Sequence, residues 1–328
     1  MNSASSPAWP ALPVVLVVLL GATPYSVAAD DKPAADSAGS NRFHFAAVDA
    51  GALGLWERDR PVFVYNHGIR EHREAPRDRR RSTYVHPLYG LDGETLTDDF
   101  PRDHFHHRGL FWAWPHVAVD GKQYDLWMLR GIRQHFERWI ERSVGAERAV
   151  LAVENGWYVG ERRIVKEEVR FVVQATRGDE RTIDFQLTLT ALERPVTLGG
   201  AEGKGYGGLS LRFAPRKETA VIADSGKLHE DANLKRMAWA DLSARFEGAK
   251  GTSGVAVFAQ RGTEGKYPNW ITREYGFLGV GSPEADAATL QPETPAKVAY
   301  RLVVHRGAGD AAQLRQNADD WLRRADGR

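Results

Sequence analysis

The chain of 328 residues contains no cysteine. Disulfide bonds, thiolate metal ligands and a cysteine nucleophile are therefore excluded. The chain also lacks an excess of either charge, because 44 Lys and Arg stand against 43 Asp and Glu, a formal net charge of +1. This balance indicates no nucleic acid as a partner. No apolar run after residue 22 is long enough to cross a bilayer, so the sequence indicates no integral membrane partner.

The first 29 residues lack charged side chains altogether. Residues 11–22 form an apolar stretch, ALPVVLVVLLGA, which is shorter than the roughly 20 residues of a membrane span. Small residues follow at positions 26–29, where signal peptidase prefers them. We expect a signal peptide over residues 1–29 and an exported protein, periplasmic or extracellular. Residues 30–41 are polar and predict a disordered linker, and residues 42–328 predict a single domain.

The sequence does contain many segments that alternate between apolar and polar residues. Residues 182–190 alternate with period two, and residues 168–175 do the same. Residues 177–180, Arg-Gly-Asp-Glu, connect the two segments as a hairpin. Residues 255–258 and 298–305 predict further strands. Strands of this kind without intervening helices predict an all-β fold, a large antiparallel β-sandwich.

One helix is predicted at the C-terminal end of the chain. Asp310 is suited to cap it, because an aspartate side chain can accept hydrogen bonds from the first free backbone N–H groups. Apolar residues follow with helical spacing at Leu314, Ala318, Trp321 and Leu322. We expect this helix to pack on the sandwich through that face.

Histidines are concentrated in residues 84–114. This segment contains four of the chain's 11 histidines, His86, His104, His106 and His107. Asp98, Asp99 and Asp103 lie among them. In an extended segment His104 and His106 would share one face and His107 would point away.

Three interpretations of this segment remain open. The first is metal-free acid/base chemistry, in which imidazole transfers protons near neutral pH and neighbouring carboxylates orient it. The second is a metal site with His86, His104 and His106 as candidate ligands, or His305 as a distant one. The third is a hydrogen-bonded turn without chemistry. The sequence requires no cofactor, and the metal interpretation implies a single divalent ion.

Other segments suggest a surface that binds sugars. Trp114 and Trp270 lie near polar clusters and are candidates to stack on a pyranose ring, although most tryptophans belong to cores. The glycine-rich residues 202–208 precede an alternating strand, and they would place Glu202, Lys204 and Tyr206 at the rim of a site. The loop 70–81 has six arginines, and its simplest interpretation is a solvated rim; the alternative is a clamp for an anionic glycan.

The residues just described carry a resemblance to a known bacterial family. The shared positions are Tyr84, His86-Pro87, Asp103-His104, His106-His107-Arg108-Gly109, Trp114, Trp127, Gly205 to Gly208, Trp270, Tyr275-Gly276, Tyr300-Arg301 and His305. On these positions residues 42–325 resemble the PmoA-like family, whose members are known mainly as domains of unknown function. The resemblance implies a galactose-mutarotase-like supersandwich and a role in carbohydrate utilisation. A membrane monooxygenase activity is rejected, because the predicted mature chain has no spanning helices.

Our leading hypothesis is an exported carbohydrate-active enzyme that acts on a glycoside or an oxidised (keto or uronate) sugar by histidine-centred chemistry. Paired carboxylates are less attractive, because no carboxylate pair stands out in the sequence. The alternatives are a non-catalytic glycan-binding module and a metal-dependent enzyme. The candidate catalytic residues are His86, Asp103, His104, His106, His107 and His305. The candidate substrate-binding residues are Arg108, Trp114, Trp127, Glu202, Lys204, Tyr206, Trp270, Arg273, Tyr275 and Arg301.

Overall fold

A computed structural model of the chain describes residues 41–262, 265–281 and 287–325. The predicted signal peptide and nearly all of the predicted linker lie outside these residues. Among the described helices, none is long and apolar enough to cross a membrane. These described residues cluster in one compact unit.

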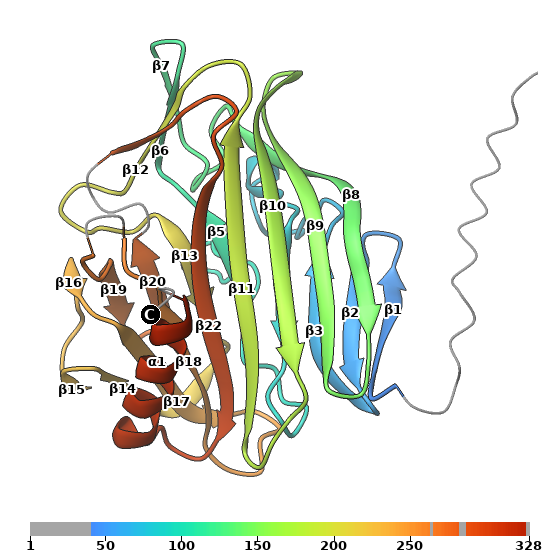
Figure 1. Ribbon diagram of the computed structural model, residues 1–328, viewed down its shortest axis with the longest axis vertical. Coiled ribbons are helices and arrows are strands. Elements are labelled where there is room, and N and C mark those ends of the chain that lie inside the picture. Colours follow the sequence, from blue (N-terminus) through green and yellow to red (C-terminus); the bar gives the residue numbers. More distant parts are fainter. Residues whose placement is uncertain (1–40, 263–264, 282–286, 326–328) are drawn as a thin grey trace, which may run out of the picture. The chain divides into compact units, whose positions relative to one another are not determined.

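Two nine-stranded sheets make up most of this unit (Figure 1). The first, sheet A, has the order β1 (Phe43–Asp49), β2 (Ala52–Glu57), β3 (Arg60–Asn66), β4 (Tyr84–Leu88), β5 (Leu110–Ala113), β13 (Gly208–Arg212), β20 (Phe277–Gly281), β19 (Asn269–Arg273) and β16 (Lys235–Arg236). The second, sheet G, has the order β15 (Gly226–Leu228), β14 (Arg216–Ala223), β17 (Trp239–Phe246), β18 (Ser253–Ala259), β22 (Ala296–Arg306), β11 (Glu180–Ala191), β10 (Arg162–Gln174), β9 (Arg148–Val159) and β8 (Arg133–Val144).

The remaining elements are short or peripheral. A four-stranded sheet contains β21 (Ala288–Leu290), β12 (Val196–Gly199), β6 (His116–Val119) and β7 (Lys122–Tyr124). A 3₁₀ turn, η1 (Arg77–Arg79), lies in the arginine-rich loop, and the helix α1 (Ala311–Ala325) ends the described chain.

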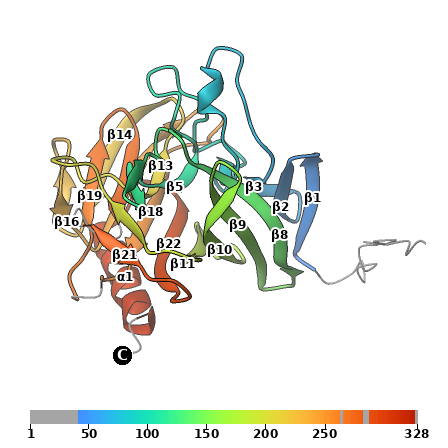
Figure 2. The ribbon, with the colours of Figure 1, turned by 90° about the horizontal axis from the view of Figure 1, so that it is seen from above.

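The core lies between sheets A and G, as the view from above suggests (Figure 2). Aromatic rings meet across it: Phe63 of β3 lies 5.4 Å from Phe171 of β10, and Trp112 of β5 lies 5.1 Å from Phe185 of β11. The alternation predicted for residues 182–190 is present in β11, whose apolar members are buried. Burying one such side chain contributes about 1.5–3 kcal/mol. The predicted all-β fold, a large antiparallel β-sandwich with a C-terminal helix, is confirmed.

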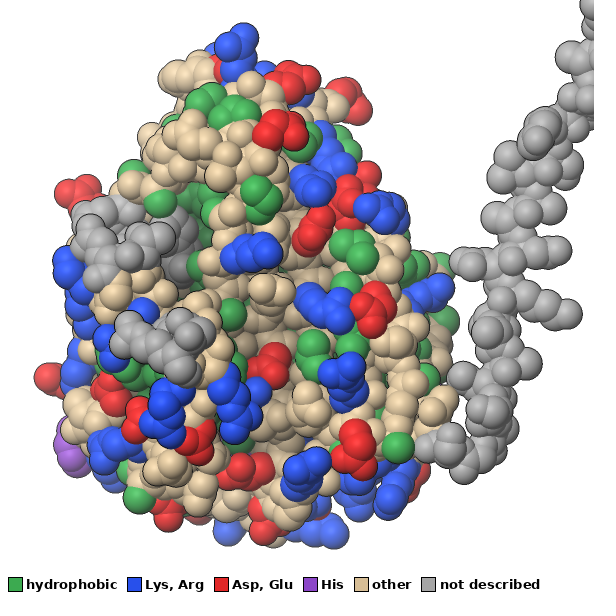
Figure 3. Space-filling view, viewed as in Figure 1, with side chains coloured by type: hydrophobic (Ala, Val, Ile, Leu, Met, Phe, Trp, Pro, Cys, Tyr) green, Lys and Arg blue, Asp and Glu red, His purple; other side chains and the backbone are tan. Residues whose placement is uncertain are grey.

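Helix α1 packs on the outer face of sheet G through Leu314, Ala318, Trp321 and Leu322, as its sequence predicts. They contact Phe258 and Val303, which point away from the core between the sheets. The Asp310 side chain caps the helix, because its Oδ1 accepts hydrogen bonds from the backbone N–H groups of Ala312 (2.8 Å) and Gln313 (3.0 Å). On this face of the molecule acidic and basic side chains are intermixed (Figure 3).

The outer face of sheet A carries a different set of side chains. Because Trp112 points into the core, its neighbour Phe111 points outward. Strand pairing places Ser210 opposite Phe111, and it places Arg212 opposite Phe277. The histidine-rich loop after β4 lies over this face, since the His107 ring contacts both Phe111 (6.0 Å) and Phe277 (4.9 Å).

Candidate functional site

The histidine loop, residues 98–109, is folded into consecutive turns. The His104 N–H donates to the carbonyl of Pro101 (2.9 Å), and the His107 N–H donates to the carbonyl of His104 (2.8 Å). The segment is therefore not extended, and the prediction that His107 points away from His104 does not hold. The three-residue spacing of the turn stacks the two imidazoles instead, with centroids 4.6 Å apart and planes at 8°.

Arg108 braces this loop from inside. Its side chain is fully buried, and Nη1 donates to the carbonyls of Phe105 (2.8 Å) and His107 (2.7 Å), while Nη2 donates to the carbonyl of Arg79. The guanidinium lies 3.5 Å from the centroid of the Phe100 ring. The prediction that Arg108 binds substrate is therefore wrong for this conformation, because its guanidinium is enclosed by the loop that it supports.

The imidazoles form part of a continuous stack of rings. Tyr275 lies on one side of His104 (5.3 Å, 18°), His107 lies on the other, and Phe277 continues the stack beyond His107 (4.9 Å, 26°). His106 packs edge-on against His107, at 4.6 Å. Only the Tyr275 end of this stack is open to solvent, with 41% of that residue exposed. His104 is thus held in a fixed plane between a buried imidazole and an accessible phenol.

His104 also has a charged partner. Its Nδ1 lies 3.0 Å from Oδ2 of Asp103, and 36% of the His104 side chain is exposed. Asp103 is itself held by Arg212 of β13, whose Nη2 donates to both carboxylate oxygens at 2.9 Å. The guanidinium of Arg212 lies 4.6 Å from the centre of the Tyr275 ring. Burial alone would raise the pKa of the Asp103 carboxyl, but the contacts with His104 and Arg212 outweigh it and lower that pKa.

The other two imidazoles of the loop are kept neutral. Burial, together with the positive charges of nearby groups that include Arg81 and Arg79, lowers the pKa of His106 to about 3. Burial lowers the pKa of His107 well below its usual range. Neutral imidazoles at these positions cannot supply protons near pH 7. The half-exposed His104, with a carboxylate on Nδ1, is the loop histidine best placed for proton transfer.

An open cleft of about 530 Å³ adjoins the Asp103–Arg212 pair. Six charged side chains line it, three basic and three acidic. They are Arg73, Arg102, Arg212, Glu74, Asp98 and Asp103. His72 and Phe100 line it as well and stack on one another at 5.8 Å. The cleft therefore offers hydrogen-bond donors, acceptors and an apolar edge within one small volume.

Several buried polar atoms beside the cleft have no hydrogen-bonding partner among the described residues. They include Nε and Nη1 of Arg212, which lines the cleft, and three atoms of residues outside its lining, Oγ of Ser210 and Nδ1 of His104 and of His107. Buried polar groups in folded proteins are almost always paired with protein or with bound water. Their gathering on the outer face of sheet A marks a place that a polar ligand or ordered water would complete.

Other predicted residues surround this cluster. Trp127 is buried against His106 (6.2 Å) and His107 (5.7 Å), and Tyr206 packs on the far side of Trp127 at 4.6 Å. His86 of β4 is half-buried, with Nδ1 3.1 Å from the Thr97 hydroxyl. Glu202 and Lys204 are exposed on the loop that carries Tyr206. The glycine-rich segment thus reaches the histidine loop through Tyr206.

The two predicted stacking tryptophans are core residues. Trp114 is 1% exposed and packs on Trp157 at 5.4 Å. Trp270 is fully buried, and its indole N–H donates to the carbonyl of Met237 at 2.7 Å. Neither ring can stack on a sugar in this structure, so both predictions are wrong. Arg273 likewise has a structural role, since its guanidinium donates hydrogen bonds to the backbone carbonyls of Ala232 and Thr272.

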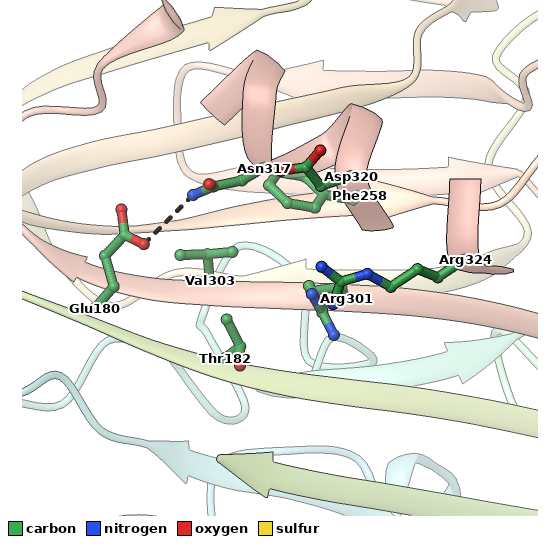
Figure 4. Close-up of a pocket in the computed structure, with 8 residues that line it drawn as sticks. All are labelled: Glu180, Thr182, Phe258, Arg301, Val303, Asn317, Asp320 and Arg324. Carbon is green, nitrogen blue, oxygen red and sulfur yellow. Dashed lines mark hydrogen bonds between the residues drawn. The ribbon is translucent and has the colours of Figure 1, made fainter. Parts of the chain in front are cut away.

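Arg301 and His305 lie on sheet G, away from the histidine loop. Arg301 makes two hydrogen bonds to Asp184, at 2.7 and 2.8 Å, and lines a pocket of about 180 Å³ beneath α1. Figure 4 shows Arg301 beside Arg324 at one end of this pocket. His305 is buried, with Nε2 2.8 Å from Oδ1 of Asp241. The prediction that both belong with the loop histidines is wrong, because their strand is part of the opposite sheet.

The metal interpretation gains no support from the geometry. Across the described ranges, no group of three or more His, Cys, Asp or Glu side chains is arranged to hold a metal ion. Of the proposed ligands His86, His104 and His106, the last two contact each other ring to ring at 5.6 Å. His86 instead faces Thr97. The described residues therefore do not form a metal centre.

Sequence reasoning missed Arg212, which joins Asp103 to Tyr275. A signal was available, because Arg212 occupies an outward position at the end of a strand whose inward positions are Leu209 and Leu211. A buried arginine on a sheet face calls for an anionic partner. The sequence does not reveal which of the many acidic residues supplies it.

Comparisons with known proteins give distant likenesses in structure. A mutant of the heparan sulfate lyase HepC from Pedobacter heparinus is 7% identical, with a TM-score of 0.41, and the match covers 81% of this chain and 37% of that one. A GalM/aldose epimerase homologue from C. elegans is 9% identical, with a TM-score of 0.33 and coverage of 81% and 98%. A heparinase III is 12% identical, with a TM-score of 0.33 and coverage of 82% and 34%. TM-scores this low carry no argument about activity.

At the level of sequence, no curated protein matches the chain. A family model does match, over residues 55–319, and its description is a family of unknown function (DUF6807). The matched segment includes the histidine loop, Arg212 and Tyr275. The comparisons do not confirm the PmoA-like name. Because the match spans most of the sequence, the chain belongs to this family of unknown function.

Proposed function

We propose that this protein is a carbohydrate-active enzyme in which His104, held by Asp103, transfers protons to or from a sugar bound in the adjoining cleft. The observation that carries the proposal is the assembly of Asp103 and Arg212, which line that cleft, with His104 and Tyr275, which contact them. The predicted export of the protein, based on residues 1–29, is part of the same proposal.

The chemistry of the cleft suits a polyol. A sugar hydroxyl both donates and accepts hydrogen bonds, and the lining has equal numbers of cationic donors and anionic acceptors. The accessible Tyr275 ring can contact the C–H face of a sugar, in the role that Trp114 and Trp270 cannot fill. A glycoside and an oxidised sugar are both in line with this lining.

Proton transfer is assigned to His104 because its two ring nitrogens have different surroundings. Asp103 lies against Nδ1, and no described residue hydrogen-bonds to Nε2. A carboxylate on one nitrogen fixes the ring orientation and stabilises the imidazolium that forms when the other nitrogen takes a proton. Nε2 is therefore the atom that would exchange a proton with substrate or water.

The test is a product screen by NMR with neutral oligosaccharides, uronate-containing oligosaccharides and keto-sugars. We expect the wild-type protein to convert at least one of them, and His104→Ala to lower turnover by at least about 100-fold. His229→Ala, which removes an exposed histidine elsewhere, is the matched control. Unchanged turnover in His104→Ala would reject the assignment, and sugar binding without product would favour the glycan-binding module instead.

A further inference from the structure

A second group suited to proton transfer lines the cleft itself, and it was not among the candidate residues drawn from sequence. Asp98 is the first residue of the histidine loop, and it lines the same cleft as Asp103 and Arg212. Its backbone N–H donates to the carbonyl of Arg212 at 2.9 Å, which fixes Asp98 beside β13. The fold thus creates the carboxylate pair that was not evident in the sequence.

The two carboxyl groups have contrasting partners. Asp103 lies within hydrogen-bonding distance of Arg212 and His104. Asp98 forms no ion pair with any described residue, and one of its oxygens accepts only the backbone N–H of Asp99, at 2.9 Å. A half-buried carboxyl that forms no ion pair favours its neutral, protonated form more than a paired one does. A carboxyl paired with arginine remains an anion.

We propose that Asp98 is the general acid of a glycoside hydrolysis in this cleft, with His104 as the base that activates water. This inference rests on the proposed function and deepens it, because it names the bond that is broken. Burial raises the pKa of the Asp98 carboxyl and outweighs the opposing effects of the Asp99 N–H and the Arg212 charge. Asp98 and Asp103 thus have pKa values shifted in opposite directions.

Arg212 supplies an independent sign that this cleft binds a ligand. Its side chain is 8% exposed and lines the cleft, and two of its nitrogens have no partner among the described residues. An unsatisfied guanidinium beside a cleft is completed by an oxygen-rich molecule. The cleft is also open rather than enclosed, so a substrate can extend beyond it into solvent on both sides of the bond that is broken.

The step balances in atoms and charge. Asp98 donates its proton to the glycosidic oxygen as the bond between that oxygen and the anomeric carbon breaks. The oxygen of a water molecule bonds to the anomeric carbon, and the proton lost by that water passes to Nε2 of His104. The products are an alcohol and a sugar with a free anomeric hydroxyl. Solvent then carries one proton from His104 back to Asp98.

Aryl glycosides of the sugar identified by the product screen test the role of Asp98. A 2,4-dinitrophenyl leaving group departs without protonation, whereas a phenyl leaving group requires it. We expect Asp98→Asn to lower turnover of the phenyl glycoside by at least about 100-fold and that of the dinitrophenyl glycoside by less than about tenfold. Asp98→Glu should recover part of the lost rate. Asp120→Asn, an exposed site on the β6–β7 turn, is the matched control.

The outcomes separate this inference from the proposed function. Equal losses of turnover on both glycosides, or no loss on either, would overturn the role of Asp98 as general acid. The role of His104 in proton transfer would be unaffected. A His104-dependent conversion of a sugar without cleavage of any glycoside would overturn the hydrolysis but not the proposed function. No conversion of any sugar would overturn both. Circular dichroism of Asp98→Asn distinguishes a folded variant from one that has lost the site by unfolding.

Discussion

Two pairs of histidine and aspartate contrast among the described residues, one on the outer face of each large sheet. His104 and Asp103 lie 3.0 Å apart beside an open cleft, with 36% and 46% of their side chains exposed. His305 and Asp241 lie 2.8 Å apart, with 5% and 0% exposed. The residue types and the distances are nearly the same, but the surroundings differ. Accessibility to a substrate, and not the pairing itself, separates a candidate catalytic pair from a structural one.

The buried pair ties α1 to sheet G. Oδ2 of Asp241 accepts a hydrogen bond from the Ser243 hydroxyl (2.9 Å), and that hydroxyl accepts the N–H of Gly309 (3.2 Å) just before the helix. His305, Asp241 and Ser243 thus form a chain of polar contacts that ends at the segment leading into α1. These contacts give a structural role to His305, which the sequence had suggested as a catalytic residue.

Removing the exposed carboxylate should have the largest effect on activity. Asp103→Ala deprives His104 of the anion that orients its ring, so we expect turnover to fall by at least about 100-fold. The free energy of unfolding should fall by only about 1–2 kcal/mol, because Asp103 is open to solvent although Arg212, 8% exposed, loses its anionic partner. Steady-state kinetics and thermal unfolding measure the two quantities. Unaltered turnover would remove Asp103 from the mechanism.

Removing the buried carboxylate should do the reverse. Asp241→Ala leaves His305 and Ser243 without their partner, so we expect about 3 kcal/mol of destabilisation. Turnover at a temperature where the variant is folded should match that of the wild type. Urea unfolding measures the change in stability. A stability equal to that of the wild type would show that the buried pair does not hold α1 to the sheet.

The two regions should also respond to pH in opposite directions. Because the folded pKa of His106 is about 3, below the 6.5 of the unfolded chain, its contribution to stability is present above pH 6.5 and is lost as the pH falls toward 3. The slope for one such group is at most about 1.4 kcal/mol per pH unit. His106→Gln should therefore flatten the acid limb of a plot of unfolding free energy against pH. An unchanged acid limb would contradict the burial of a neutral imidazole at this position.

The pKa of His305 is raised, because the hydrogen bond and charge of Asp241 outweigh burial. Its contribution is therefore fully present below pH 6.5 and is lost as the pH rises through the folded pKa. His305→Gln should remove this loss at higher pH while leaving the acid limb due to His106 intact. If the unfolding free energies of the two variants depended on pH in the same way, the prediction that the two regions respond to pH in opposite directions would be wrong.

The smallest predicted effect concerns helix α1, which follows the segment that the buried pair contacts through Ser243. Asp310→Ala removes the side chain that caps α1, so we expect destabilisation by about 1 kcal/mol. Turnover should not change, because α1 lies on sheet G and the cleft lies on sheet A. Asp310→Asn, which retains a capping oxygen, should recover most of the loss. Chemical unfolding of the three proteins under one set of conditions is the measurement.

The fold could be predicted largely because local patterns report it. Alternation in residues 182–190 identified β11, and the cap at Asp310 with the spacing from Leu314 to Leu322 identified α1. These features depend on neighbours in the chain, which a single sequence contains. The order of the strands depends on long-range pairing, such as β13 with β5 and β20, and no local pattern encodes it.

The candidate site was only half predictable for the same reason. The histidine loop is contiguous, so its composition revealed it, and Asp103 and His104 are neighbours in sequence. Arg212 lies 109 positions from Asp103, and the pair exists only because β13 lies beside β5. The same limit produced the errors at Trp114 and His305, since which face of which sheet a strand residue occupies depends on the whole topology.

The most direct test of the account compares turnover by His104→Gln and His305→Gln on the sugar that the wild-type protein converts, at a temperature where both variants are folded. We predict that His104→Gln loses at least about 100-fold in turnover, and that His305→Gln retains the wild-type rate with reduced stability. Full activity in His104→Gln, or its loss in His305→Gln alone, would contradict the placement of the catalytic pair on sheet A.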